Sequence, residues 1–95
     1  MNENVARKRC VVRYEGSVQG VGFRFNAVRQ TAGLSLHGYV RNEPDGSVLM
    51  DVEGTALDVN RLLKRIKADM QDNIEAIQVD EGPLTGVTDG FNIRH

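Results

Sequence analysis

The chain has 95 residues, which is the size of one small domain, and we expect residues 1–95 to form a single domain. Its 12 basic and 13 acidic residues give a net charge of −1, which argues against a general nucleic-acid-binding protein, since such proteins usually have a basic surplus. No apolar run approaches the ~18 residues of a membrane span, and residues 1–9 lack the apolar core of a signal peptide. We therefore expect a cytoplasmic protein with no membrane and no nucleic-acid partner.

The first polar stretch, 1–7, predicts a flexible tail. Residues 9–15 then alternate between two faces, and apolar residues on both faces predict an inner strand. Cys10 lies in this strand; as the only cysteine it can form no internal disulfide, and we expect it to be buried. Residues 16–22 contain three glycines and predict a loop.

The stretch 23–34 shows helical periodicity. Around the helix, Phe25 falls within a broad apolar arc and Asn26 falls on the opposite, polar arc. Arg24 projects into the middle of the apolar arc, where a cation without a partner is costly. We therefore expect Arg24 to meet either a group near the sheet or an anion that binds and leaves.

The next two segments predict a β-hairpin. Residues 36–42 and 47–53 each alternate between apolar and polar side chains, as strands do. They are joined by residues 43–46, in which Pro44 and Gly46 favour a tight turn.

A second helix is predicted to begin after Gly54. Thr55 and Asp58 have the spacing of a capping box, in which the two side chains reciprocally satisfy backbone N–H groups. Apolar residues then recur at helical spacing and predict one buried stripe: Val59, Leu62, Leu63, Ile66 and Met70. Residues 74–80 predict a fourth strand, and residues 91–93 predict a short final strand.

The resulting element order is β-α-β-β-α-β with an extra terminal strand, which is the split β-α-β arrangement. We therefore predict an α+β fold, with an antiparallel sheet of four to five strands and two helices on one face.

The glycine loop and Arg24 are the first candidates for chemistry. Glycines before a helix let consecutive backbone N–H groups turn inward around an anion, and the helix adds the positive end of its dipole. Arg24, on the first turn, can hold two phosphate oxygens with its planar guanidinium. The loop is not a nucleotide loop, because Phe25 stands at the third glycine of the dinucleotide motif and no Gly-Lys pair occurs. The alternative is a tight glycine turn whose arginine forms a salt bridge within the chain.

Asn42 is the second candidate, because it shares the parity of Val40 and its amide can bind a water and a phosphate oxygen at once. The alternative is that Asn42 only starts the turn before Pro44. His37 and His95 have no partner at metal-ligand spacing, so we expect no metal and no other cofactor. Without an obvious nucleophile or base, the remaining chemistry is attack by water on an already activated substrate.

The segment Gly16-Ser17-Val18-Gln19-Gly20-Val21-Gly22-Phe23-Arg24 resembles the signature of the acylphosphatases. A second block of that family is similar to residues 36–42 followed by Asp45-Gly46-Ser47-Val48. The resemblance extends over nearly the whole chain in length and element order. It implies a ferredoxin-like α/β sandwich that hydrolyses the carboxyl–phosphate bond of small acyl phosphates without a metal, giving a carboxylate and inorganic phosphate.

The resemblance also implies roles for individual residues. Arg24 would bind the phosphoryl group together with the loop backbone, at Gln19, Gly20, Val21, Gly22 and Phe23. Asn42 would orient the attacking water, whose proton would pass to the substrate's own phosphate. Inorganic phosphate would be both product and competitive ligand, and we expect a monomer, because no unaccounted apolar stripe demands a partner.

Two residues depart from the family pattern. Ser17 stands where a basic residue is usual, and Ser35 stands where glycine is usual, after the first predicted helix. A left-handed residue after a helix favours glycine, and Gly33 could take that role instead of Ser35.

Three other interpretations remain open. The element order also suits an RNA-binding domain, although residues 47–53 carry no aromatic side chain on which a base could stack. Acylphosphatase-like domains also occur within larger carbamoyl-transfer proteins of hydrogenase maturation, but the chain ends soon after its last strand, which favours a stand-alone enzyme. The third alternative is a non-catalytic module that only binds an anion.

Overall fold

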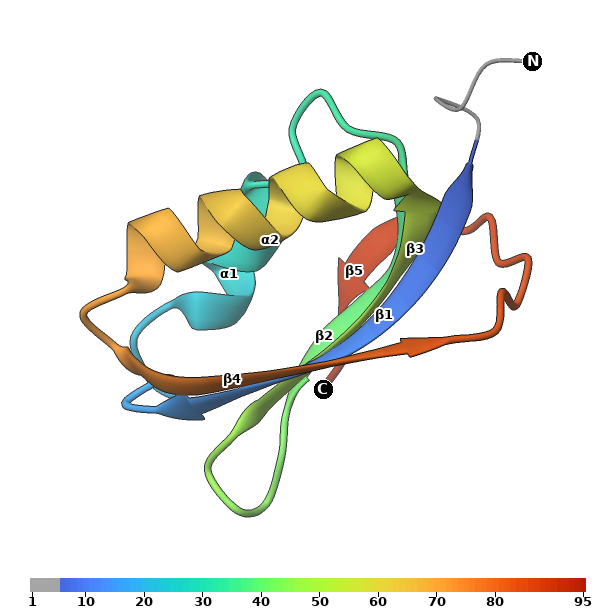
Figure 1. The fold of residues 1–95 in the computed structure, drawn as a ribbon. Helices are drawn as coiled ribbons and strands as arrows, with labels where there is room; N and C mark the ends of the chain where they lie inside the picture. Colours follow the sequence, from blue (N-terminus) through green and yellow to red (C-terminus); the bar gives the residue numbers. More distant parts are fainter. Residues whose placement is uncertain (1–5) are drawn as a thin grey trace.

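The computed structural model describes residues 6–95, and its elements follow the predicted order. They are β1 (Arg7–Gly16), α1 (Phe23–Arg29), β2 (Leu36–Asn42), β3 (Val48–Thr55), α2 (Ala56–Met70), β4 (Ile74–Gly82) and β5 (Phe91–Ile93). Both helices lie on the same face of a single sheet (Figure 1). The predicted two-layer α+β architecture is therefore confirmed.

The sheet has the strand order β4-β1-β3-β2-β5, with β1 and β3 at its centre. Four strands pair antiparallel, as predicted, but β5 pairs parallel to β2. The difference arises because the connection after β4 carries the chain from one edge of the sheet to the other before β5 begins. β1, which leads into the glycine loop, is thus held on both sides by hydrogen-bonded neighbours.

The core lies between the sheet and the helices. Cys10 is buried, as predicted, and the stripe of α2 is buried except for the partly exposed Leu63. The rings of Tyr14 and Phe23 pack with their centroids 4.8 Å apart, an ordinary spacing for a tilted aromatic pair. This contact fastens the start of α1 to the central strand β1.

Helix α1 is five residues shorter than the predicted 23–34, because it ends at Arg29. The next backbone bonds run from Thr31 N–H to the Val28 carbonyl and from Ala32 N–H to the Arg29 carbonyl, which tightens and closes the last turn. Gly33 then takes the left-handed conformation, with φ 78°.

Gly33 thereby fills the role that the family pattern gives to the position of Ser35. Among residues 6–95, no residue other than glycine has a positive φ, so Ser35 is not in a left-handed conformation. The departure at Ser35 therefore imposes no backbone strain.

The prediction for the faces of α1 was wrong at two positions. Asn26 is buried, with 5% of its surface exposed, and Phe25 is 76% exposed. Phe23 and Ala27 are both buried one turn apart, and Asn26, three residues after Phe23, lies on the face that they bury. Phe25, two residues after Phe23, is rotated by about 200° and faces solvent.

Two further differences concern element ends. The strand β1 begins at Arg7, which pairs with Thr55, so Arg7 does not belong to the predicted tail; residues 1–5 of that prediction lie outside the described residues. The capping box is half formed: the Thr55 hydroxyl accepts from the Asp58 N–H, but the Asp58 carboxylate accepts from the Ser35 N–H. The cap therefore ties α2 to the end of the α1–β2 connection.

Candidate active site

The glycine loop runs from the end of β1 to the start of α1. Gly20 and Gly22 have φ values of 76° and 77°, in the left-handed region that favours glycine. A Cβ added at either position would meet nothing within 4 Å, so the backbone conformation, and not lack of space, accounts for glycine there. Gly22 also caps α1, because its carbonyl accepts the first helical bond, from the Asn26 N–H at 2.9 Å.

Buried side chains anchor the two ends of the loop. Val18 and Phe23 are 1% and 2% exposed, whereas Gly20, Val21 and Gly22 between them are exposed. The loop is therefore fixed at its ends and presents its central backbone to solvent.

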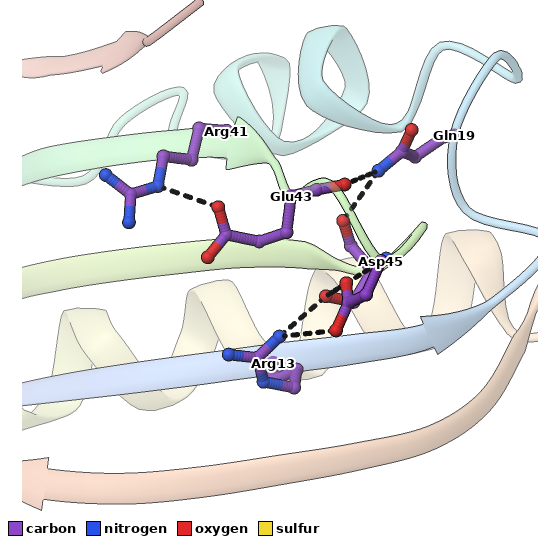
Figure 2. A network of polar contacts seen from close by, with 6 residues as sticks. Arg13, Gln19, Arg41, Glu43 and Asp45 are labelled. Atoms are coloured by element: carbon purple, nitrogen blue, oxygen red, sulfur yellow. Dashed lines mark hydrogen bonds and ion pairs between the residues drawn. The ribbon is translucent and has the colours of Figure 1, made fainter.

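The side chain of Gln19 ties this loop to the turn between β2 and β3. Its amide Nε2 donates to the backbone carbonyls of Glu43 and Ser47, at 2.8 Å each (Figure 2). The sequence prediction assigned only the backbone of Gln19 to the site and missed this contact, which joins residues 24 and 28 positions apart. One sequence signal could have indicated this contact: Gln19 is a polar residue in a loop whose other central residues are glycine and valine.

The β2–β3 turn is itself stiffened by charged side chains. Asp45 accepts from the Ser47 N–H at 2.9 Å and from the Ser47 hydroxyl at 2.6 Å, and these bonds lower the pKa of Asp45. Arg13, on β1, donates to the same Ser47 hydroxyl at 2.7 Å, and Arg41 pairs with Glu43 at 3.1 Å (Figure 2). The turn that follows Asn42 is therefore held to β1 and to the glycine loop.

A concavity of about 150 Å³ brings the predicted site residues together. It is lined by residues from the loop, from the first turn of α1 and from the end of β2: Val18, Gly20, Gly22, Phe23, Arg24, Phe25 and Asn42. Arg24 and Asn42, which are distant in sequence, thus share one small hollow. Of the other predicted residues, Gly20, Gly22 and Phe23 line it, whereas Gln19 and Val21 do not.

Arg24 is half-buried at this concavity and is free of a carboxylate partner. Within residues 6–95 it forms no salt bridge, and its one side-chain hydrogen-bond contact there is between Nη1 and His95 Nδ1, at 3.5 Å. The alternative of an internal salt bridge is therefore not seen. A half-buried guanidinium with unused donors is suited to an anion with several oxygens.

Asn42 is also half-buried, at the last position of β2. Its backbone pairs with Val48, and its side chain makes no hydrogen bond to any residue in the range 6–95. The polar bonds inside the turn come instead from Asp45 and Ser47, so Asn42 is not needed to start the turn. Its amide is available to a ligand or a water.

His37 does not line the concavity. His37 Nδ1 accepts from the Gly90 N–H at 2.9 Å, which fastens the chain just before β5 to β2. Across residues 6–95, no group of three or more His, Cys, Asp or Glu side chains is placed to hold a metal ion.

The family model for Acylphosphatase matches residues 10–93 of the chain. The chain belongs to the acylphosphatase family. It is 34% identical to an acylphosphatase of Salinibacter ruber over 93 residues, covering 97% of this chain and 98% of that protein. The predicted family is thus confirmed, and with it the enzyme class, acylphosphatase.

Solved structures agree with the assignment. The chain is similar to the crystal structure of acylphosphatase from Bacillus subtilis, with 25% identity and a TM-score of 0.81, covering 93% of this chain and 99% of that one. It is also similar to part of T. kodakarensis HypF, with 28% identity and a TM-score of 0.78, covering 93% of this chain and 12% of that one. These matches do not favour the RNA-binding alternative.

Within residues 6–95, no helix combines the length and the apolar composition needed to cross a membrane.

Proposed function

We propose that the concavity between the glycine loop and the end of β2 is the active site, at which small acyl phosphates are hydrolysed. Arg24 and the backbone N–H groups of the loop, from Gln19 to Phe23, bind the phosphoryl group. Asn42 holds the attacking water. The products are a carboxylate and inorganic phosphate.

The observation that supports this proposal most directly is that Arg24 and Asn42 line one hollow with unused polar groups. A guanidinium that has no carboxylate partner keeps its charge for a ligand. An amide whose side chain makes no hydrogen bond within the described chain can accept a hydrogen bond from water and donate one to a phosphoryl oxygen. The hollow is also well below the ~300 Å³ of sites for larger ligands, and so suits a single phosphoryl group.

The chemistry requires little beyond positioning and charge stabilisation. Water held by Asn42 attacks phosphorus, and the bond between phosphorus and the bridging oxygen breaks with its electron pair on the carboxylate. The proton of the water passes to a phosphoryl oxygen, so no protein base takes part. Arg24 and the loop N–H groups stabilise the charge on the phosphoryl oxygens during this transfer.

The chain's own rigidity serves this mechanism. The loop is anchored by Val18 and Phe23, and Gln19 connects it to the turn just after Asn42. The phosphoryl-binding and water-binding groups are therefore held at a fixed separation before substrate arrives. Such preorganisation avoids the free-energy cost of arranging these groups during the reaction.

Hydrolysis of acetyl phosphate and benzoyl phosphate, measured with and without a chelator, tests the function. We expect the protein to hydrolyse acyl phosphates equally well in both conditions, and inorganic phosphate to inhibit competitively. Loss of activity with chelator would contradict the metal-independent mechanism, and no hydrolysis in either condition would contradict the function. The cytoplasmic location and the monomeric state also stay predictions, for which cell fractionation and sedimentation are the direct measurements.

A further inference from the structure

Phe25 is the largest apolar side chain left uncovered beside the active-site hollow. It is 76% exposed, more than any other large hydrophobic residue among those described. The core does not need it, because Phe23 and Ala27 fill the buried face of α1. Because its ring stays in water, it also adds little hydrophobic stabilisation to the fold.

The position of Phe25 links it to the substrate. It follows Arg24 directly, and the two side chains line the same concavity. Of the other side chains there, Val18 and Phe23 are buried and form the base, and the two glycines have no side chain. Among the residues that line the hollow, Phe25 is thus the one with a large, exposed apolar side chain.

The geometry of an acyl phosphate places its acyl group at this rim when the phosphoryl group lies in the hollow. The hollow, at about 150 Å³, suits the phosphoryl group, and the acyl carbon is joined to it through a single bridging oxygen. The acyl group must therefore leave the hollow toward solvent, past the rim. An aromatic or branched acyl group that reaches Phe25 would remove apolar surface of both partners from water.

We propose that Phe25 is the acyl-group contact of this enzyme and makes it prefer acyl phosphates with aromatic or other large apolar acyl groups. This inference rests on the proposed function, because it assumes that the phosphoryl group binds beside Arg24. A small acyl group such as acetyl is too short to cover the ring and gains little from it. The ring contacts the substrate but takes no part in bond breaking.

The test compares kcat/KM for benzoyl phosphate and acetyl phosphate in the wild type and in Phe25→Ala. We expect Phe25→Ala to lower kcat/KM for benzoyl phosphate about 3- to 10-fold, the range of a single aromatic contact, and to leave acetyl phosphate within about 2-fold. Inhibition by inorganic phosphate and the unfolding temperature should not change, because Phe25 faces solvent and does not hold the loop. Phe25→Tyr, which keeps the ring, should retain the preference.

The matched control is Leu57→Ala, which removes another exposed apolar side chain, 46% exposed, on α2 and outside the hollow. It should leave both substrates unchanged. An equal loss for both substrates in Phe25→Ala, or no loss for either, would overturn the inference while the wild-type activity upholds the proposed function. A wild type that hydrolyses neither substrate would overturn the proposed function, and the inference with it.

Discussion

The amide Nε2 of Gln19 lies 2.8 Å from the backbone carbonyl oxygen of Glu43, the residue that follows Asn42. A second bond from the same nitrogen reaches Ser47 at 2.8 Å. One side chain therefore connects the glycine loop to the end of the strand that carries Asn42. We expect the separation of the two halves of the proposed site to depend on this connection.

Replacing Gln19 by alanine tests whether this connection positions the site. Loss of two partly buried hydrogen bonds should lower the free energy of unfolding by about 1–2 kcal/mol. Because Asn42 would no longer be held at a fixed distance from the loop, kcat should fall roughly 10- to 100-fold, with a smaller change in inhibition by phosphate. Denaturant unfolding and steady-state kinetics measure the two effects.

The control for Gln19→Ala is Gln78→Ala, on the exposed edge strand β4, whose amide donates to the nearby Asp80 carboxylate. It should change neither kcat nor stability appreciably. If Gln19→Ala lowered stability and left kcat unchanged, Gln19 would be a structural tie without a positioning role.

Replacing Arg24 by alanine should remove most of the activity. The guanidinium provides the only cationic side chain among the residues that line the hollow, so its loss should lower kcat/KM by about 100- to 1000-fold or more. Inhibition by inorganic phosphate should be lost as well. Arg61→Ala, which removes an exposed arginine of α2, is the matched control and should keep wild-type rates. Full activity in Arg24→Ala would exclude the proposed mechanism.

Replacing Asn42 by alanine should separate turnover from binding. The attacking water would lose its anchor, so we expect kcat to fall about 100-fold. Inhibition by inorganic phosphate should be largely kept, because Arg24 and the loop remain. Asn60→Ala, at an exposed position of α2, is the control. A folded Asn42→Ala protein that no longer binds phosphate would show that Asn42 is a ligand or an anchor of the loop instead.

We expect the stability of the fold to depend on pH through the buried carboxylate of Glu53. Its carboxylate is 1% exposed and accepts from the Thr85 N–H, the Thr85 hydroxyl and the Gly86 N–H. Burial alone would raise the pKa of Glu53, but these bonds outweigh burial and lower the pKa below its ordinary value of 4.5. The carboxylate therefore contributes stability that is fully present above about pH 4.5 and is lost as the pH falls through the lower, folded-state pKa.

The measurement is the free energy of unfolding against pH for the wild type and Glu53→Gln. At pH 7 the variant should be less stable by about 1–3 kcal/mol, because three donors lose their charged acceptor. The difference should shrink as the pH falls below 4.5, the ordinary value of the glutamate pKa. Glu75→Gln, at an exposed position of β4, should follow the wild-type curve. A constant difference between wild type and Glu53→Gln at all pH values would contradict the assignment.

Much of the fold could be predicted because its signals are local. The bounds of β2 and β5 were predicted as they stand, and the hairpin connection was predicted to within one residue, since alternation and turn residues act over a few positions. The site residues Arg24 and Asn42 could also be proposed from the sequence, on the glycine loop and the family resemblance. The structure adds that the two line one hollow.

The wrong predictions concern residues whose burial depends on contacts with residues distant in the sequence. Periodicity alone placed Phe25 inside and Asn26 outside, because helical spacing does not state which neighbours the helix will meet. The packing of Phe23 against Tyr14 sets the rotation of α1, buries Asn26 and turns Phe25 toward solvent. The same contact explains why an apolar side chain is available at the rim of the site.

By itself, then, the sequence determined the element order, the family and the two side chains proposed to act on substrate, because local patterns and a contiguous motif encode them. Only the tertiary structure decided that Gln19 joins the loop to the turn and that Phe25 borders the hollow. It also decided that β5 runs parallel to β2. These features depend on which distant segments come into contact in the folded chain. Such contacts produce no periodic pattern in the sequence from which they could be predicted.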